Sequence, residues 1–306
     1  MYNLKFASTY DFAVMRENNI KAVTEDYFAV ARNLFCVADG VTRDLIDGTS
    51  LKYPSTKEEA QSLIEKYPNP SGAAMASTIC ATSFIKYASS VDKISENSIT
   101  EILKKINCDI WEINKNRTDI DYVKEDLYGC VAVGGIITDD YLYCFSIGDC
   151  RIKLLDNDFD TIFDTENLNH NLLPYEEPEE FIKLYNSEWK WENPKYREYY
   201  RKNIRNNVQR FENGVYSFGV LTGEETALPF IKTSKIPLNK VKYILAYSDG
   251  CEECLDNKDK IIDVINNPEQ IKNEAHEKTL LIFEKDWKNY YSYQKFLKSN
   301  LHENIS

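Results

Sequence analysis

The sequence has few histidines, no long apolar run and fewer basic than acidic side chains. Its 37 lysines and arginines face 49 aspartates and glutamates, which gives a net charge of −12. A free protein of this charge has no general attraction for nucleic acid or anionic membranes. No apolar stretch is long enough to span a bilayer. We therefore expect neither nucleic acid nor a membrane among the partners.

An export signal is also missing from the first residues. The segment Met1-Tyr-Asn-Leu-Lys-Phe6 lacks a basic region followed by a long apolar run, so we expect a cytoplasmic protein. The eight cysteines are an even number, but several lie inside apolar runs, which is typical of small buried thiols. Cys251-Glu-Glu-Cys254 has redox or zinc spacing without a second pair, and we favour buried residues there too.

The length and composition are those of a soluble globular protein. A chain of 306 residues can form one large domain or two smaller ones. Its hydrophobic content is 43% and its charged content 28%. The sequence contains no internal repeat and no low-complexity linker, so we expect a single domain over residues 1–306.

Apolar runs predict a series of strands. They lie at Leu4–Phe12, Tyr27–Ala31, Leu34–Ala38, Gly129–Thr138, Tyr141–Ile147, Arg151–Leu155, Val215–Phe218, Pro229–Ile236, Lys242–Tyr247 and Lys278–Glu284. The Asp139-Asp140 pair between two of these runs predicts an antiparallel hairpin.

Helices are expected mainly between the third and fourth strands. A short helix is predicted at Lys57–Lys66, a long one after a Ser71 cap, and a second long one around Ile99–Ile113. A tail helix is expected at 288–299. Runs of strands with helices gathered in pairs predict an α+β fold.

The segment 165–213 is charged and aromatic, and we expect it to be helical. It carries a basic stretch, Lys195, Arg197, Arg201, Lys202, Arg205 and Arg210. This stretch could receive acidic or phosphorylated partners. We favour the simpler interpretation of a solvated helix face paired with Glu198 and other acids.

Three apolar runs end with an aspartate beside a glycine. These pairs are Asp39-Gly40, Gly148-Asp149 and Asp249-Gly250, and a fourth acidic pair, Glu25-Asp26, opens another run. Each pair alone is a common turn signal. Carboxylates at the mouths of buried strands are costly unless they are paired or bind a cation. Their recurrence predicts one shared site with hard oxygen ligands for a metal.

The order Glu-Asp, Ala-Asp-Gly, Gly-Asp after a hairpin and Ser-Asp-Gly resembles the type 2C (PPM) family of metal-dependent protein phosphatases. The resemblance runs from about Phe6 to about Phe283. It implies a four-layer αββα sandwich of two antiparallel sheets flanked by helix pairs. It further implies a serine/threonine phosphatase that uses two Mn²⁺ or Mg²⁺ ions on phosphorylated proteins, with 165–213 as a variable flap.

The resemblance also assigns roles to individual residues. Asp39 would bridge the two ions, the Gly40 carbonyl would bind one ion, and Asp249 would hold the other. A hydroxide bridging the metals would then attack phosphorus in line, without a phosphoenzyme.

The remaining acidic positions match the family's accessory roles. Glu25 and Asp26 would orient metal-bound water. Asp149 would contact metal waters and could help to bind a third ion.

Several positions depart from the family pattern. Lys21 stands where the family has a phosphate-binding arginine, and lysine lacks the bidentate fork, so nearby Arg16 could substitute. Thr42-Arg43 replaces a glycine pair, which puts the third ion in doubt and could bring Arg43 to the phosphate.

Two further departures concern histidine. His276 stands where the family has its last metal aspartate, and either it or the adjacent Glu277 could serve as ligand. Val41 occupies the place of a candidate acid histidine, so we expect water to protonate the leaving group.

Three alternatives stay open at this stage. The chain could be a catalytically impaired pseudophosphatase that acts as a binding module. It could be a phosphatase of small metabolites on the same fold, or its aspartates could be plain turns. We expect a monomer.

Overall fold

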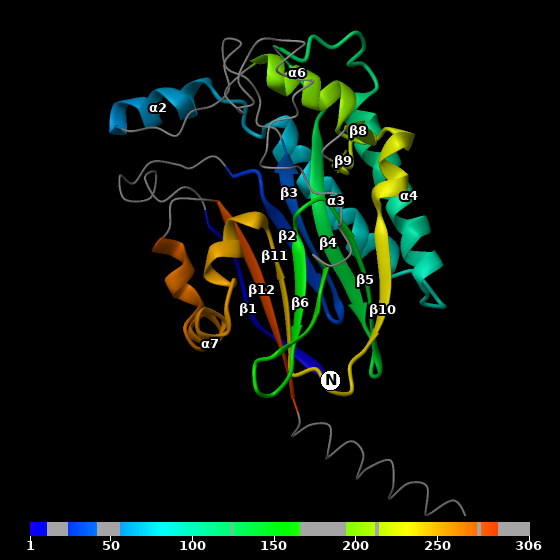
Figure 1. Ribbon diagram of the computed structural model, residues 1–306, viewed down its shortest axis with the longest axis vertical. Coiled ribbons are helices and arrows are strands. Elements are labelled where there is room, and N and C mark those ends of the chain that lie inside the picture. Colours follow the sequence, from blue (N-terminus) through cyan, green and yellow to red (C-terminus); the bar gives the residue numbers. More distant parts are fainter. Residues whose placement is uncertain are drawn as a thin grey trace, which may run out of the picture.

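The computed structural model describes residues 1–10, 24–41, 56–123, 125–165, 194–211, 214–273 and 277–286. Two five-stranded antiparallel sheets form its centre (Figure 1). The first sheet has the order β1 (Tyr2–Tyr10), β12 (Lys278–Lys285), β11 (Tyr243–Tyr247), β6 (Arg151–Leu155) and β7 (Thr161–Asp164). The second has the order β10 (Lys232–Pro237), β5 (Tyr141–Ile147), β4 (Gly129–Ile137), β3 (Leu34–Val41) and β2 (Tyr27–Ala31).

The two sheets share a buried apolar layer. Alternate residues of β3 face it, with Phe35 and Val37 packed against residues of the first sheet such as Phe283. The residues between them, Cys36 and Ala38, face the helices on the other side. Because β3 is buried on both faces, its sequence is a nearly continuous apolar run.

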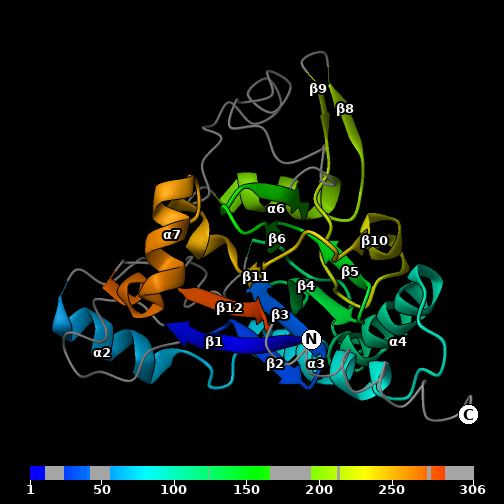
Figure 2. The same ribbon diagram turned by 90° about the horizontal axis from the view of Figure 1, so that it is seen from below.

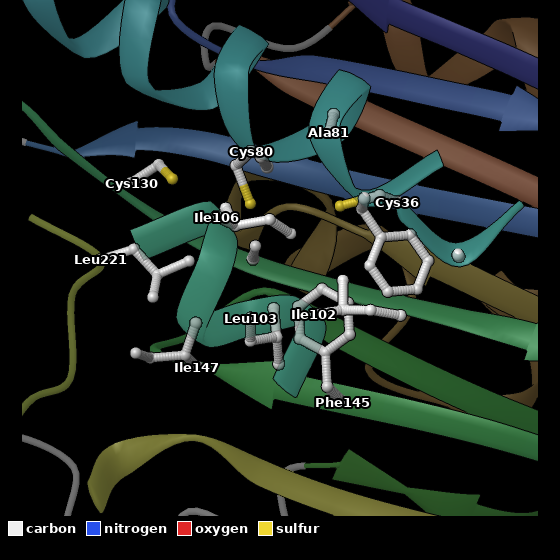
Figure 3. Close-up of a cluster of buried hydrophobic side chains, with 14 of the residues drawn as sticks. Cys36, Cys80, Ala81, Ile102, Leu103, Ile106, Cys130, Phe145, Ile147 and Leu221 are labelled. Atoms are coloured by element: carbon white, nitrogen blue, oxygen red, sulfur yellow. The ribbon is translucent and has the colours of Figure 1, made fainter. Parts of the chain in front are cut away.

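Two long helices cover the outer face of the second sheet. They are α3 (Gly72–Ala88) and α4 (Glu96–Asn114), and Figure 3 shows their contact with the sheet around Cys80, Ile106 and Phe145. The Ser71 side chain caps α3 by accepting a hydrogen bond from the Ala74 amide, as the sequence predicted.

The outer face of the first sheet is covered by α7 (Lys258–Asn266) with two 3₁₀ segments, η3 (Asp249–Cys254) and η4 (Pro268–Asn273). Figure 2 shows α7 on the far side of the sheets from α3 and α4. The expected four-layer αββα arrangement is therefore confirmed, and 3₁₀ segments make up much of its second outer layer.

The remaining elements lie around this sandwich. They are α2 (Lys57–Lys66), α6 (Pro194–Asn203), the hairpin of β8 (Gln209–Phe211) and β9 (Gly214–Tyr216), and η2 (Glu225–Phe230). No helix among the described residues has both the length and the apolarity to cross a bilayer.

One predicted strand begins too early. The sequence analysis placed a strand at 229–236, but Pro229 lies in η2 and pairing with β5 begins at Lys232. Residues 225–230 form η2 instead, and the Ile231 amide caps this segment by donating to the Leu228 carbonyl oxygen, so the ladder begins at the next residue. The predicted tail helix at 288–299 and most of the segment 165–213 lie outside the described residues.

The interpretation of the basic stretch as a solvated face is wrong for its three central arginines. Arg197, Arg201 and Arg205 are all buried, whereas Lys202 is exposed and pairs with Glu198 as expected. Arg201 Nε lies 2.6 Å from Asp126 Oδ2 and Arg205 Nη1 lies 2.5 Å from Asp126 Oδ1. One buried carboxylate thus attaches α6 to the loop before β4.

We expect the Asp126→Asn variant to lower the free energy of unfolding by about 3–5 kcal/mol, because it leaves two buried guanidinium groups without their anion. Urea denaturation measures this loss. The control is Glu101→Gln, which breaks the exposed Lys104–Glu101 pair and should change stability by less than about 1 kcal/mol. Equal effects of the two variants would contradict the anchoring role.

Candidate active site at the strand ends

Strand register brings Asp26 and Asp39 side by side. Tyr27 at the start of β2 pairs with Ala38 near the end of β3. Continuing this register by one residue places Asp26 opposite Asp39. Their carboxyl groups share a hydrogen bond. From the sequence, both residues were expected at the ends of strands. The antiparallel pairing of β2 and β3 brings these two strand ends together.

The first sheet contributes the other carboxylates at the same end. Tyr247, the last residue of β11, pairs with Arg151 at the start of β6 and with Leu280 near the start of β12. Asp249 therefore follows β11 close to where Asp149 precedes β6 and Glu277 precedes β12. This is the end of the sheets nearer α6 and away from the N-terminus (Figure 1).

The charges of all these groups act on the pKa of Asp39. Burial raises its pKa well above the usual range, and the neighbouring charges of Asp26, Asp249, Asp149 and Glu277 raise it further. Protonation of Asp39 is therefore favoured when no cation is present, and a proton there would be available for a hydrogen bond with Asp26. The five carboxyl groups form one electrostatic unit.

Asp26 is held by the end of β11. Ser248 Oγ donates a 2.6 Å hydrogen bond to Asp26 Oδ2 and itself accepts one of 2.9 Å from the Thr279 amide. Burial raises the pKa of Asp26 to about 6, while the Ser248 and Thr279 hydrogen bonds work in the opposite direction. Ser248 therefore ties the acidic pair before β2 to both central strands of the first sheet.

The Glu277 side chain holds the same acidic pair by binding the backbone amides of that pair. Its Oε1 atom accepts hydrogen bonds from the amides of Glu25, at 2.6 Å, and Asp26, at 2.9 Å. The side chain thereby joins the start of β12 to the start of β2. A carboxylate with two amide donors is oriented firmly, and one of its oxygens is engaged as an acceptor.

Glu25 points towards the start of α3 and is 1% exposed. Its Oε1 atom accepts hydrogen bonds from Ser71 Oγ, at 2.6 Å, and from the Tyr67 hydroxyl. Ser77 Oγ donates to the Glu25 backbone carbonyl. The residue that caps α3 therefore also fixes the side chain of Glu25.

Two glycines of the Asp-Gly motifs are required by close packing. A Cβ atom at Gly40 would lie 2.7 Å from the Ala73 carbonyl oxygen and 2.9 Å from that of Glu25. A Cβ atom at Gly250 would lie 1.9 Å from the Glu277 carbonyl oxygen. A side chain at either position would push apart the segments that carry the acidic residues.

Asp149 lies at the turn between β5 and β6. Burial raises its pKa to about 7, with a further contribution from the charge of Asp249. Arg151 opposes this rise, and the Arg151 guanidinium also pairs with Glu252 at 2.7 Å. The charge of Arg151 therefore acts on both Asp149 and Glu252.

The chemistry of this donor set suits a hard divalent cation. Carboxylates that repel one another in a buried place are relieved either by protons or by positive charge. Within the described ranges, however, no three Asp, Glu, His or Cys side chains converge as a ready-made metal cage. The hydrogen bonds of Asp26 and Glu277 explain this, because they hold these carboxylates on neighbouring strand ends.

Several predicted site residues cannot be placed. Lys21, Arg16, Arg43 and His276 lie outside the described residues. Seven others, Glu25, Asp26, Asp39, Gly40, Asp149, Asp249 and Glu277, gather at the one end of the sheets.

The sequence analysis missed the hydroxyl groups that hold these acids. Ser248 directly precedes the Asp249-Gly250 motif and could have been found from that position alone. Tyr67 and Ser77 carry no signal in the sequence that points to Glu25, because their contacts depend on how α3 packs against β2.

No family model matches the sequence, and no curated protein is similar to it. The fold itself has counterparts among solved structures. The Mycobacterium tuberculosis serine/threonine phosphatase PstP has a TM-score of 0.53 and 12% identity, over 94% of this chain and 98% of that one. The catalytic domain of PstP in complex with two manganese ions has a TM-score of 0.53 and 11% identity, over 93% and 99%.

A mutant of a bacterial serine phosphatase is similar to the same degree. Its TM-score is 0.52 and its identity 12%, over 93% of this chain and 97% of that one. The resemblance to type 2C phosphatases is confirmed at the level of the fold. At these identities the likeness does not extend to the activity, which has to be argued from the site.

The raised pKa values predict how stability depends on pH in the absence of cations. The pKa of Asp26 rises from 3.8 to about 6 on folding, so the folded protein holds this proton more tightly than the unfolded chain. The stability that this proton contributes is present below about pH 4 and is lost as pH rises towards about 6. The pKa of Asp149 is raised to about 7, so the loss of stability with rising pH continues to about pH 7.

We therefore expect Asp26→Asn to gain stability relative to the parent protein as pH rises through this window, because asparagine carries no proton to lose. Urea denaturation of both proteins with a chelator present, at several pH values, measures the difference. A difference that is independent of pH would contradict the assignment of the raised pKa.

Proposed function

We propose that this protein is a divalent-cation-dependent phosphatase that hydrolyses phosphoserine and phosphothreonine in proteins. The observation that carries the proposal is the position of Asp39, whose pKa four other carboxylates raise at one end of the two sheets. The shared fold with serine/threonine phosphatases supports the choice of reaction.

The same carboxylates suit two Mn²⁺ or Mg²⁺ ions, with a third as an open alternative. Asp39, the Gly40 carbonyl and Asp249 would hold the first two, with Glu277 or His276 as a further ligand. Asp149 would take part in holding a third. Bound there, divalent ions would supply Lewis-acid stabilisation of the phosphoryl oxygens and a more acidic water.

The chain's own residues prepare this site by orienting two acidic side chains. Ser248 and the Asp39 carboxyl group hold Asp26 in a fixed orientation. Tyr67 and Ser71 do the same for Glu25. Asp26 and Glu25 can then orient water at the strand ends, since their acceptor oxygens are already set by protein donors.

Phosphate binding is assigned to basic residues that lie outside the described part of the chain. Lys21, Arg16 and Arg43 stay as predictions from the sequence, with Lys21 as the primary phosphate ligand and a catalytic contributor. Protonation of the leaving group by water also stays a prediction, because all three histidines lie outside the described residues.

The organisation of the chain follows from the same proposal. Residues 1–306 would form one phosphatase domain, since the two sheets share a buried layer. The segment 165–213 would be a flap beside the site, and the tail helix at 288–299 an appendage. In support, the charge of Asp149 contributes to the raised pKa of Tyr200 on α6. A cytoplasmic monomer remains our expectation.

A second candidate function is a pseudophosphatase that uses the fold for binding. The observation that favours it is that the described carboxylates do not converge into a cage for metal. A phosphatase of small metabolites is the third candidate. Turnover of a phosphothreonine peptide compared with that of sugar phosphates and nucleotides separates it from the first.

We expect turnover of para-nitrophenyl phosphate and a phosphothreonine peptide with Mn²⁺, and its loss with a chelator. Asp39→Asn and Asp249→Asn should each lower kcat/KM by at least about a hundredfold, because each removes a charge that holds the cation. The matched control is Asp139→Asn in the exposed hairpin turn between β4 and β5, at the far end of the sheet. Folded protein that neither turns over substrate nor binds Mn²⁺ would favour the pseudophosphatase.

Glu277→Gln tests which residue replaces the family's last metal aspartate. Glutamine keeps an oxygen that can accept from the Glu25 and Asp26 amides, but it lacks the negative charge. We expect Mn²⁺ affinity, measured by isothermal titration calorimetry, to fall by about 10–100-fold. His276→Ala should leave the affinity within about twofold of the parent value. A larger loss of Mn²⁺ affinity in His276→Ala than in Glu277→Gln would assign the ligand role to His276.

A further inference from the structure

The Cys251/Cys254 pair lies directly behind the candidate site. Both residues belong to η3, the 3₁₀ segment that begins at Asp249. In a 3₁₀ helix the side chains at positions i and i+3 eclipse, so the spacing of this pair stacks one thiol on the other. Cys254 Sγ donates to the Cys251 carbonyl oxygen at 3.0 Å, and the two thiol groups influence each other's pKa.

The two thiols differ in access and in electrostatic surroundings. Cys254 is 8% exposed and Cys251 is fully buried. The hydrogen bond from Cys251 lowers the pKa of Cys254 to about 7, and the charges of Lys278 and Lys260 act in the same direction. A lowered pKa favours the thiolate, which is the form that attacks an oxidant, and of the two thiols only that of Cys254 is not fully buried.

We propose that Cys251 and Cys254 form a redox-active dithiol that hydrogen peroxide converts reversibly into a disulfide. Cys254 is the attacking thiol and Cys251 the resolving thiol. The sequence alone favoured two inert buried residues, and the stacking of the thiols in η3 is what changes this interpretation.

The reaction balances in two steps. The Cys254 thiolate attacks one peroxide oxygen, the O–O bond breaks, and the departing hydroxide takes up a proton to become water. Cys251 sulfur then attacks the sulfenic sulfur of Cys254, the S–O bond breaks, and a second water leaves with the Cys251 proton. The two thiols lose two electrons and the peroxide gains them.

The dithiol is connected to the acidic cluster through one carbonyl group. Cys251 Sγ donates to the Thr279 carbonyl oxygen at 3.5 Å, and the Ser248 amide donates to the same oxygen at 3.0 Å. Ser248 in turn donates to Asp26. A disulfide removes the Cys251 proton from this carbonyl and moves its sulfur towards Cys254.

The other cysteines supply internal controls. Cys36, Cys80 and Cys130 lie in the apolar layer between the second sheet and its helices, as Figure 3 shows, and all three are fully buried. Burial raises the pKa of Cys36 and Cys130 well above the usual range, whereas the neighbouring thiols of Cys130 and Cys36 lower the pKa of Cys80 to about 5. Because none of the three is exposed, we expect all of them to stay reduced, and Cys80 tests whether burial alone protects a thiol of low pKa. Cys108 is exposed and reports that the oxidant was active.

The deciding measurement is peptide mapping of the folded full-length protein after peroxide treatment. Remaining thiols are alkylated under denaturing conditions before digestion with trypsin. We expect the peptide 243–258, which holds both residues and no other cysteine, to lack two hydrogen atoms and to take no label. Dithiothreitol should restore labelling. If both cysteines take the label while Cys108 is oxidised, the proposal is overturned.

Two variants test the assigned roles. In Cys251→Ser, Cys254 should form a sulfenic acid that dimedone traps. In Cys254→Ser, Cys251 should stay reduced and take the label. Trapping at Cys251 instead would overturn the order of attack. Should either variant fail to fold, the map of the unmodified sequence still decides whether the disulfide forms.

The effect of oxidation on activity rests on the proposed function. We expect peroxide to lower turnover about tenfold in the parent protein and to leave Cys254→Ser unaffected. A disulfide without any turnover in reduced protein would refute the phosphatase and keep the dithiol. Turnover by a protein that forms no disulfide would refute the dithiol and keep the phosphatase.

Discussion

Repulsion among carboxyl groups at one end of the sheets is the constraint on which the site depends. Burial raises the pKa of Asp39 well above its usual range, and the charges of Asp26, Asp249, Asp149 and Glu277 raise it further. Such a cluster is costly by itself. It persists because the protein holds its members on separate strand ends through hydrogen bonds, while the two sheets behind them bury a shared apolar layer.

Packing elsewhere in the fold offsets the free-energy cost of gathering carboxyl groups at this end of the sheets. β3 is buried on both faces, so the strand that carries Asp39 is fixed by the layer between the sheets and by α3 and α4. Gly40 has no room for a side chain, because α3 and the Glu25 carbonyl approach it closely. A strand fixed in this way can deliver a carboxylate to a set position, which catalysis by positioning requires.

Much of the fold could be predicted from particular residues. β2 has the bounds that its apolar run indicated, and the Ser71 cap begins α3 where the sequence placed it. These predictions succeed because capping and strand formation depend on nearby residues. The strand that was placed from Pro229 begins three residues later, because the residues before it form η2. α7 was not predicted, because it is only nine residues long and its burial comes from the first sheet.

The sequence by itself determined the order of the acidic motifs, the strands that carry them and the glycines beside them, because each of these is a property of a short segment. Only the tertiary structure decided which groups meet. The Glu277 side chain reaches the Glu25 amide across 252 positions, and Ser248 reaches Asp26 across 222. Contacts of this kind depend on the register of the two sheets. The burial of Arg201 against Asp126 and the effect of the Lys278 charge on Cys254 likewise join segments that are distant in the sequence. No local pattern records them, because the partner that makes each one favourable is supplied by a distant part of the chain.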